Sequence, residues 1–93
     1  MQFDWDPEKA ERNLSDHGIS FDEAQTAFED FFCVEFFDPD HSYDEQRFIL
    51  IGQSSELRTL FISYAERENR IRIISARKAT PKERRDYEFG RFE

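Results

Sequence analysis

The chain has 93 residues, of which 38% are hydrophobic and 37% are charged, and its net charge is -8. This length allows one modest hydrophobic core, so we expect a single domain over residues 1–93. The eleven Phe residues exclude an acidic disordered tail, because such tails carry few aromatic side chains.

The sequence also favours a reducing compartment without a membrane segment. Its first residues lack the basic region and apolar run of a signal peptide. No apolar stretch approaches the ~20 residues that span a bilayer. Cys33 is the only cysteine and cannot form an internal disulfide. We therefore expect a cytoplasmic protein.

Two helices are predicted at the start of the chain. Residues 5–18 have Asp6 as an N-cap, Pro7 at the first helical position and Gly18 as a C-cap. Residues 20–30 begin with a Ser followed three residues later by a Glu, which is the spacing of a capping box.

After Asp30 the pattern changes to β-strands. Four apolar segments rich in Phe, Ile and Leu are joined by short connections, which favours an antiparallel meander. The predicted strands are residues 31–37, 47–52, 57–67 and 70–78. Several of them are apolar on both faces, so we expect the first two helices to cover one face of the sheet and leave part of the other bare.

A third helix is predicted over residues 80–92. Thr80 provides an N-cap, Pro81 fits the first helical position, and Glu83 completes a capping box. The sequence therefore predicts an α+β fold, in which two N-terminal helices precede a four-stranded antiparallel sheet and a C-terminal helix.

The charge is unevenly distributed along this fold. Residues 1–65 hold four Lys or Arg against fifteen Asp or Glu, whereas residues 66–91 hold nine against five. The basic segment indicates either a local anion site or a set of salt bridges to acidic neighbours, and charge alone does not separate the two.

The sequence gives little support for a metal site or for a catalytic Ser or Cys nucleophile. Asp38, Asp40 and His41 could be imagined as ligands, but their spacing fits no recognised zinc motif, and Asp-Pro-Asp is typical of a turn. We expect no metal or other cofactor. The motifs of serine hydrolases and P-loop proteins do not occur.

The basic segment suits cleavage of RNA by attack of its own 2′-hydroxyl, which needs a base, an acid and cations that stabilise the charged phosphorus centre. Arg77 is the first candidate for that cation and Arg67 the second, on the expectation that both point into one shallow site. The candidate proton carriers are His41, Glu45 and Tyr87.

Strand alternation divides the basic residues of the last strand between its two faces. It places Arg72 and Lys78 on one face of the last strand, with Ile74 and Ala76, and Arg77 on the opposite face. We predict that Arg72, Lys78, Arg47 and Arg84 bind RNA.

Three stretches of the chain resemble the BrnT family of bacterial toxins. They are WDPEKAERNLSDHGISFDEA at the start, DHSYDEQRFILIG in the middle and ERENRIRIISARKATPKERRDYE at the end. The last stretch is the most characteristic, and it holds Arg67, Arg72, Arg77 and Lys78. The middle stretch holds His41, Glu45 and Arg47.

The resemblance implies a fold and a partner. BrnT proteins are similar to the RelE superfamily of small α+β endoribonucleases, which cut RNA and arrest growth. The resemblance implies a BrnA-like ribbon-helix-helix antitoxin, and contact with operator DNA only through that antitoxin.

A second interpretation remains open. The chain could be a non-catalytic module that binds a DNA-binding repressor and modulates it, with the arginines as interface anchors. Growth arrest on expression of the chain alone would separate the two interpretations.

Overall fold

We describe the protein from a computed structural model, in which residues 1–90 are described. Arg91 and Phe92, which the sequence places in the third helix, lie outside the described residues. In chain order the elements are β1 (Gln2–Asp4), α1 (Pro7–His17), α2 (Phe21–Ala27), β2 (Val34–Phe37), the 3-10 turn η1 (Pro39–His41), β3 (Arg47–Gln53), β4 (Thr59–Arg67), β5 (Arg70–Lys78) and α3 (Pro81–Gly90).

The sheet differs from the prediction by one strand. It has five strands in the order β1-β5-β4-β3-β2, and β1 runs parallel to β5 while the other pairs are antiparallel. The predicted four-stranded antiparallel sheet is therefore wrong in this respect. β1 has only three residues and pairs with the strand most distant in sequence, so no hairpin or periodic pattern announces it.

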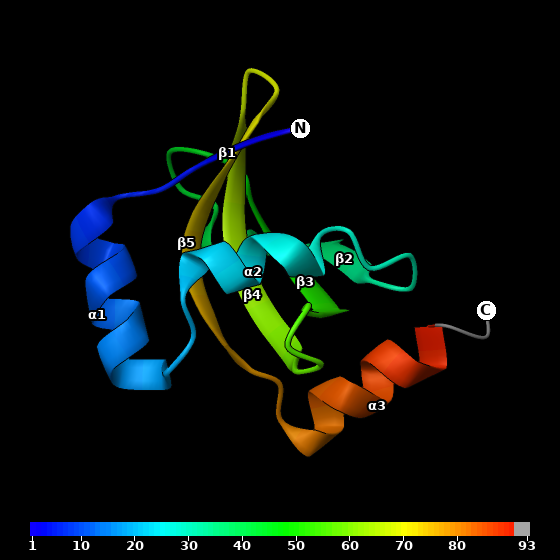
Figure 1. Cartoon of the computed structure of the whole chain (residues 1–93). Helices are drawn as coiled ribbons and strands as arrows, with labels where there is room; N and C mark the ends of the chain where they lie inside the picture. The colour runs from blue at the N-terminus through cyan, green and yellow to red at the C-terminus, as the bar shows by residue number, and fades with distance from the viewer. Residues whose placement is uncertain (91–93) are drawn as a thin grey trace.

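The helices divide between the two faces of the sheet, as predicted. Side chains of β3, β4 and β5 form the main core with Ile19, Phe21 and two alanines of α2. On the opposite face, Tyr87 of α3 packs against Ile49 and Ile51 of β3. Figure 1 shows α1 and α2 away from α3, which lies at the other end of the sheet from the β4–β5 turn.

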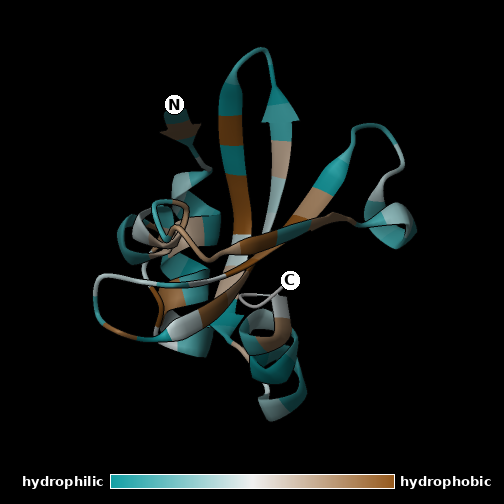
Figure 2. Ribbon diagram, turned by 90° about the vertical axis from the view of Figure 1, so that its right-hand side faces the viewer, coloured by the Kyte–Doolittle hydropathy of each residue, from teal (hydrophilic) through white to brown (hydrophobic). Residues whose placement is uncertain are grey.

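Alternating side chains give the long strands their two faces, and Figure 2 shows the alternating hydrophobic and hydrophilic bands along them. We call the face that α1 and α2 cover the helix face, and the face that meets α3 the open face. The turn between β4 and β5 consists of Glu68 and Asn69, both with positive φ, as in the tight turns of β-hairpins.

The caps form where the sequence predicts them. Ser20 Oγ accepts a hydrogen bond from the Glu23 amide at 3.0 Å, and Thr80 and Glu83 cap α3 reciprocally. Glu23, however, does not complete the first capping box. Its carboxylate instead accepts hydrogen bonds from Ser54 and Arg58, and the bonds to Arg58 lower the pKa of Glu23.

The edge of β5 beyond β1 is closed by a side chain rather than a strand. Asn13 of α1 is buried, and its amide donates to the carbonyl of Ala76 at 2.8 Å and accepts from the Ala76 amide at 3.0 Å. A second bond runs from Asn13 to the carbonyl of Ile19. The carboxamide therefore takes the place of a neighbouring peptide group, because buried backbone donors and acceptors need partners.

Candidate functional site

A groove on the open face collects three of the predicted site residues. His41, Arg47 and Arg77 come from η1, β3 and β5, and they line a hollow of about 500 Å³. Its other lining residues are Phe36, Asp38, Ile49, Phe61, Ser63, Ile74 and Ser75. We call this hollow the open-face groove.

Arg77 stands at one end of the groove in a fixed orientation. Its Nη1 and Nη2 donate to the two carboxylate oxygens of Glu83 at 2.8 and 3.0 Å. The guanidinium carbon lies 4.1 Å from the centre of the Phe61 ring, which is a cation–π arrangement. The hydrogen bonds to Glu83 raise the pKa of Arg77, so its charge is permanent.

One fork of the Arg77 guanidinium stays open. Glu83 takes one hydrogen from each terminal nitrogen, and the carbonyl of Lys78 takes the second hydrogen of Nη1 at 3.3 Å. Within residues 1–90, nothing accepts from Nε or from the second hydrogen of Nη2. These two N–H groups form a pair that can meet two oxygens of one phosphate.

Glu83 has two tasks. It accepts from the Thr80 amide at 2.9 Å as part of the cap of α3, and it anchors Arg77 at the same time. The hydrogen bonds from Arg77 lower the pKa of Glu83. The helix that follows β5 thus supplies the group that aims the arginine at the end of β5.

His41 faces the groove from the short turn after β2. Its Nδ1 lies 2.9 Å from Asp38 Oδ2, and about two thirds of the side chain is exposed. The turn is held by Ser42, whose hydroxyl donates to the Asp38 carbonyl and accepts from the Arg47 amide. Because Asp38 holds the ring through Nδ1, Nε2 stays available to exchange a proton with a bound molecule.

Arg47 is the second arginine of the groove. Its Nε is buried and has no hydrogen-bond partner among the described residues. Arg47 pairs across the sheet with Ala65, which pairs with Arg72, so alternation places both arginines on the open face. A buried N–H without a hydrogen-bond partner is costly, so Arg47 is held at some expense of stability.

The face predicted for Arg72 is wrong because of a bulge. Ser63 pairs with Ser75 but Tyr64 pairs with Ile73, so Ile74 has no partner on β4. The extra residue shifts the alternation along β5, and Ile71, Ile73 and Ala76 all join the main core. Arg72 therefore shares a face with Arg77, and its Nη1 lies 3.3 Å from Asp4.

The expectation that Arg67 and Arg77 point into one site is also wrong. Antiparallel pairing puts Arg67 opposite Arg70, at the turn, and Arg77 opposite Phe61, near the other end. The seven steps along the backbone from Arg70 to Arg77 correspond to about 23 Å in a strand. Arg67 instead pairs with Glu45, its Nε donating at 2.6 Å, and neither residue lines the groove.

The remaining predicted residues lie apart from the groove. Tyr87 is buried against β3, and its hydroxyl donates to Asp30 Oδ2 at 2.6 Å. Lys78 pairs with Leu60 and so falls on the helix face, and Arg84 is exposed on α3.

Two groove residues, Ser63 and Ser75, are absent from the sequence-based prediction. Each lies two residues from another groove residue on its strand, Phe61 and Arg77 respectively, and so shares its face. Their meeting across the sheet depends on a strand register that the sequence does not reveal.

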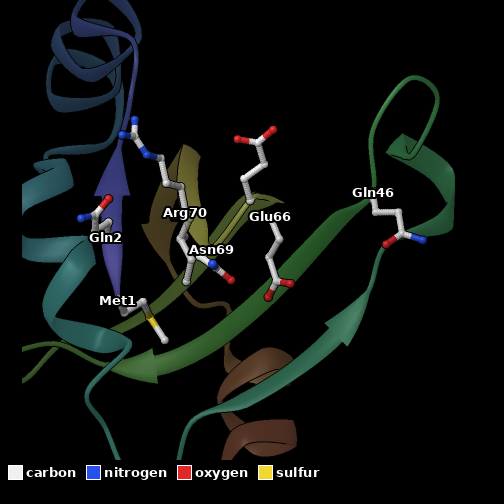
Figure 3. Close-up of a pocket in the computed structure, with 8 residues that line it drawn as sticks. Met1, Gln2, Gln46, Glu66, Asn69 and Arg70 are labelled. Atoms are coloured by element: carbon white, nitrogen blue, oxygen red, sulfur yellow. The ribbon is translucent and has the colours of Figure 1, made fainter.

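A larger hollow lies at the turn end of the sheet. Figure 3 shows Met1 and Gln2 at the start of the chain and Glu66, Asn69 and Arg70 near the β4–β5 turn around it, with Gln46 on the far side. Its volume is about 970 Å³, but its charged side chains are one arginine against two glutamates. Because Arg70 also lies 3.7 Å from Asp4, this hollow has no net positive charge to hold a phosphate.

Within residues 1–90, neither a candidate metal cluster nor a candidate membrane-spanning helix is found. No three His, Cys, Asp or Glu side chains there are grouped so that they could hold a metal ion. No helix in the same part of the chain is long and apolar enough to cross a membrane.

Comparison with known proteins identifies one family. A family model described as a ribonuclease toxin, BrnT, of type II toxin–antitoxin systems matches residues 5–83. The crystal structure of the Brucella abortus ribonuclease toxin, BrnT, is 26% identical to this chain and superposes with a TM-score of 0.64. That superposition covers 86% of this chain and 97% of the Brucella chain. No curated protein sequence matches the chain.

Proposed function

The chain belongs to the BrnT family of ribonuclease toxins of type II toxin–antitoxin systems, and we propose that it cuts RNA in the open-face groove without a metal ion. In this proposal the chain is an endoribonuclease of the cytoplasm, and the damage to cellular RNA arrests growth. An antitoxin neutralises it.

One observation carries the proposal. Three separate elements bring two arginines and a histidine to a single groove, where Ser63 and Ser75 add two hydroxyls. Arginine is suited to the phosphate, since its fork meets two oxygens and does not lose its charge. Histidine is suited to the proton, since its ordinary pKa lies near neutrality.

The proposed reaction is an internal transfer at phosphorus. The 2′ oxygen of one nucleotide forms a bond to the adjacent phosphorus while the bond from phosphorus to the 5′ oxygen breaks. His41 takes the 2′ proton through Nε2, and the departing 5′ oxygen takes a proton from solvent. The products are a 2′,3′-cyclic phosphate and a free 5′-hydroxyl.

Arg77 and Arg47 act on the charge that builds up at the phosphate oxygens. The open fork of Arg77 binds two oxygens, and Glu83 keeps the guanidinium from turning away. Arg47 adds a second permanent positive charge to the groove. Donors that are already in position cost no reorganisation when the charge develops.

The partner in this proposal is a BrnA-like antitoxin with a ribbon-helix-helix part. The toxin contacts operator DNA only through it. An acidic toxin suits a basic partner segment, because opposite charge steers association.

The test uses purified chain and naked RNA, with and without EDTA. We expect cleavage to continue in EDTA and to leave 2′,3′-cyclic phosphate ends. Loss of cleavage in EDTA would contradict a metal-free reaction, and 3′-hydroxyl ends would contradict attack by the 2′ oxygen.

The overall charge favours the alternative of a non-catalytic module that modulates a repressor. A net charge of -8 opposes RNA binding, which depends on neutralised phosphates. A catalytically competent chain will arrest growth when expressed alone, whereas a binding module will not.

A further inference from the structure

The outer edge of β2 forms one border of the sheet. β2 is the last strand and pairs only with β3 among the described residues. Edge strands are usually protected by being short, by charged residues or prolines, or by a bulge. β2 has four residues and carries Glu35, which contacts the Tyr64 hydroxyl on the helix face, but it has no proline, bulge or lysine.

The register shows which backbone groups this edge offers. The amide of Asp38 donates to the carbonyl of Arg47 at 2.9 Å, just beyond the end of β2. In an antiparallel pair the bonded residues alternate, so Phe36 and Val34 also bond to β3. The N–H and C=O groups of Glu35 and Phe37 therefore point outward, where a further strand could pair with them.

The side chains around this edge are apolar and exposed. Phe36 and Phe37 follow each other on opposite faces and are 48% and 47% exposed, and Phe31 is 91% exposed. Exposed aromatic residues grouped in this way are typical of a surface that binds another protein. An added strand would cover Phe36 on one face and Phe37 on the other.

The charge of this region indicates which kind of segment could bind at the edge of β2. Residues 29–45 contain seven Asp or Glu and no Lys or Arg. Arg67 contacts Glu45 from β4, but the segment as a whole stays acidic. A second copy of this chain on the same edge would bring two such segments together, which like-charge repulsion opposes. A basic segment with apolar residues fits both the charge and the aromatic side chains.

We propose that an extended, basic segment of the antitoxin pairs with β2 as a sixth strand. This inference rests on the proposed function, because it names the surface through which the toxin is neutralised. Phe36 lines the open-face groove, so a strand beside β2 lies along the rim of that groove. Main-chain pairing supplies affinity in this mode of recognition, and alternate side chains supply specificity.

Amide hydrogen exchange of the full chain, free and bound, tests the inference. The probe is the small protein of the neighbouring reading frame whose co-expression relieves growth arrest. On complex formation we expect the amides of Glu35 and Phe37 to exchange at least tenfold more slowly. The amides of Val34 and Phe36 should already be slow in the free chain, because they bond to β3.

Two variants at one position separate backbone pairing from side-chain contact. Phe37→Ala and Phe37→Pro both remove the ring, but only the second removes the outward N–H. We expect Phe37→Pro to weaken the complex at least tenfold more than Phe37→Ala does. RNA cleavage by each free variant reports whether it is folded, since Phe37 does not line the groove.

The outcomes distinguish the strand-pairing site from the antitoxin itself. If a complex forms and slows exchange elsewhere but not at Glu35 and Phe37, the strand-pairing site is wrong while the antitoxin is supported. Equal affinities of two folded Phe37 variants would also rule out the strand-pairing site. If no neighbouring protein relieves the arrest, both the antitoxin and this inference are wrong.

Discussion

Arg77 and Glu83 show how a single residue can serve two elements. Glu83 caps α3 through Thr80 and holds Arg77 at the end of β5. The sequence predicts the cap because its signal is local, and it predicts Arg77 as the leading phosphate ligand. The ion pair between them spans a strand-to-helix connection whose shape the sequence does not specify.

Asn13 is another residue whose role comes from its place in the fold. In the sequence it is an ordinary polar residue of an amphipathic helix. In the structure it is 6% exposed and satisfies the backbone of Ala76 and the carbonyl of Ile19. Removal of its carboxamide would leave three buried backbone groups without partners.

We predict that Asn13→Ala lowers the free energy of unfolding by on the order of 3 kcal/mol. The matched control is Ser15→Ala on the exposed side of the same helix, which should change it by less than about 0.5 kcal/mol. Urea denaturation of both variants measures the difference. Equal stabilities would show that water replaces the carboxamide at the edge of β5.

At the scale of elements, local sequence signals predict the helices and most of the strands. They do not predict pairings between residues that are distant in the sequence. The three helices and the strands β3, β4 and β5 begin and end within a few residues of the prediction. β1 escapes prediction because three residues carry no pattern. The bulge at Ile74 escapes it because it exists only in the pairing of β5 with β4, and it reverses the predicted face of Arg72.

The join between β5 and α3 should be sensitive to acid. The pKa of Glu83 is lowered in the folded protein, so the ionised carboxylate stabilises the fold. This stabilisation is lost progressively as the pH falls below the ordinary glutamate pKa of about 4.3. Glu83→Gln keeps the shape and the cap but not the charge. We predict that the wild type is more stable than this variant by about 1 kcal/mol at pH 7, a modest value because the pair is partly exposed.

Thermal unfolding of the two proteins between pH 7 and pH 3 measures this effect. The difference in their stabilities should shrink steadily toward the acid end, because protonation of Glu83 removes the charge by which the two proteins differ. A difference that persists at pH 3 would mean that the charge of Glu83 is not its cause.

At the scale of the whole molecule, the segregated charge resolves into separate surfaces. The basic segment does not form one patch, since Arg67 and Arg70 lie at the turn end of the sheet and Arg77 lies near the other end. The sequence therefore predicts the candidate site only in part. His41, Arg47 and Arg77 converge, whereas Arg67, Glu45 and Tyr87 do not, because strand direction separates residues that are near in sequence.

Acidic residues outside the basic segment also gather in one region of the structure. Residues 29–45 surround the outer edge of β2, next to the groove rather than on the far side of the molecule. A basic partner that binds there would lie beside the site that it has to block. Proximity of the two surfaces gives neutralisation a simple steric basis.

Catalysis in the open-face groove is tested most directly by the rate at which Arg77 variants cleave naked RNA in a single turnover. Arg77→Ala should reduce the rate by about 100- to 1000-fold, as expected for a lost transition-state contact. Arg77→Lys should be nearly as slow, since lysine keeps the charge but not the fork. Arg85→Ala removes an exposed arginine of α3 outside the groove and should cleave at the wild-type rate. If folded Arg77→Ala cleaves as fast as Arg85→Ala, the open-face groove is not the catalytic site.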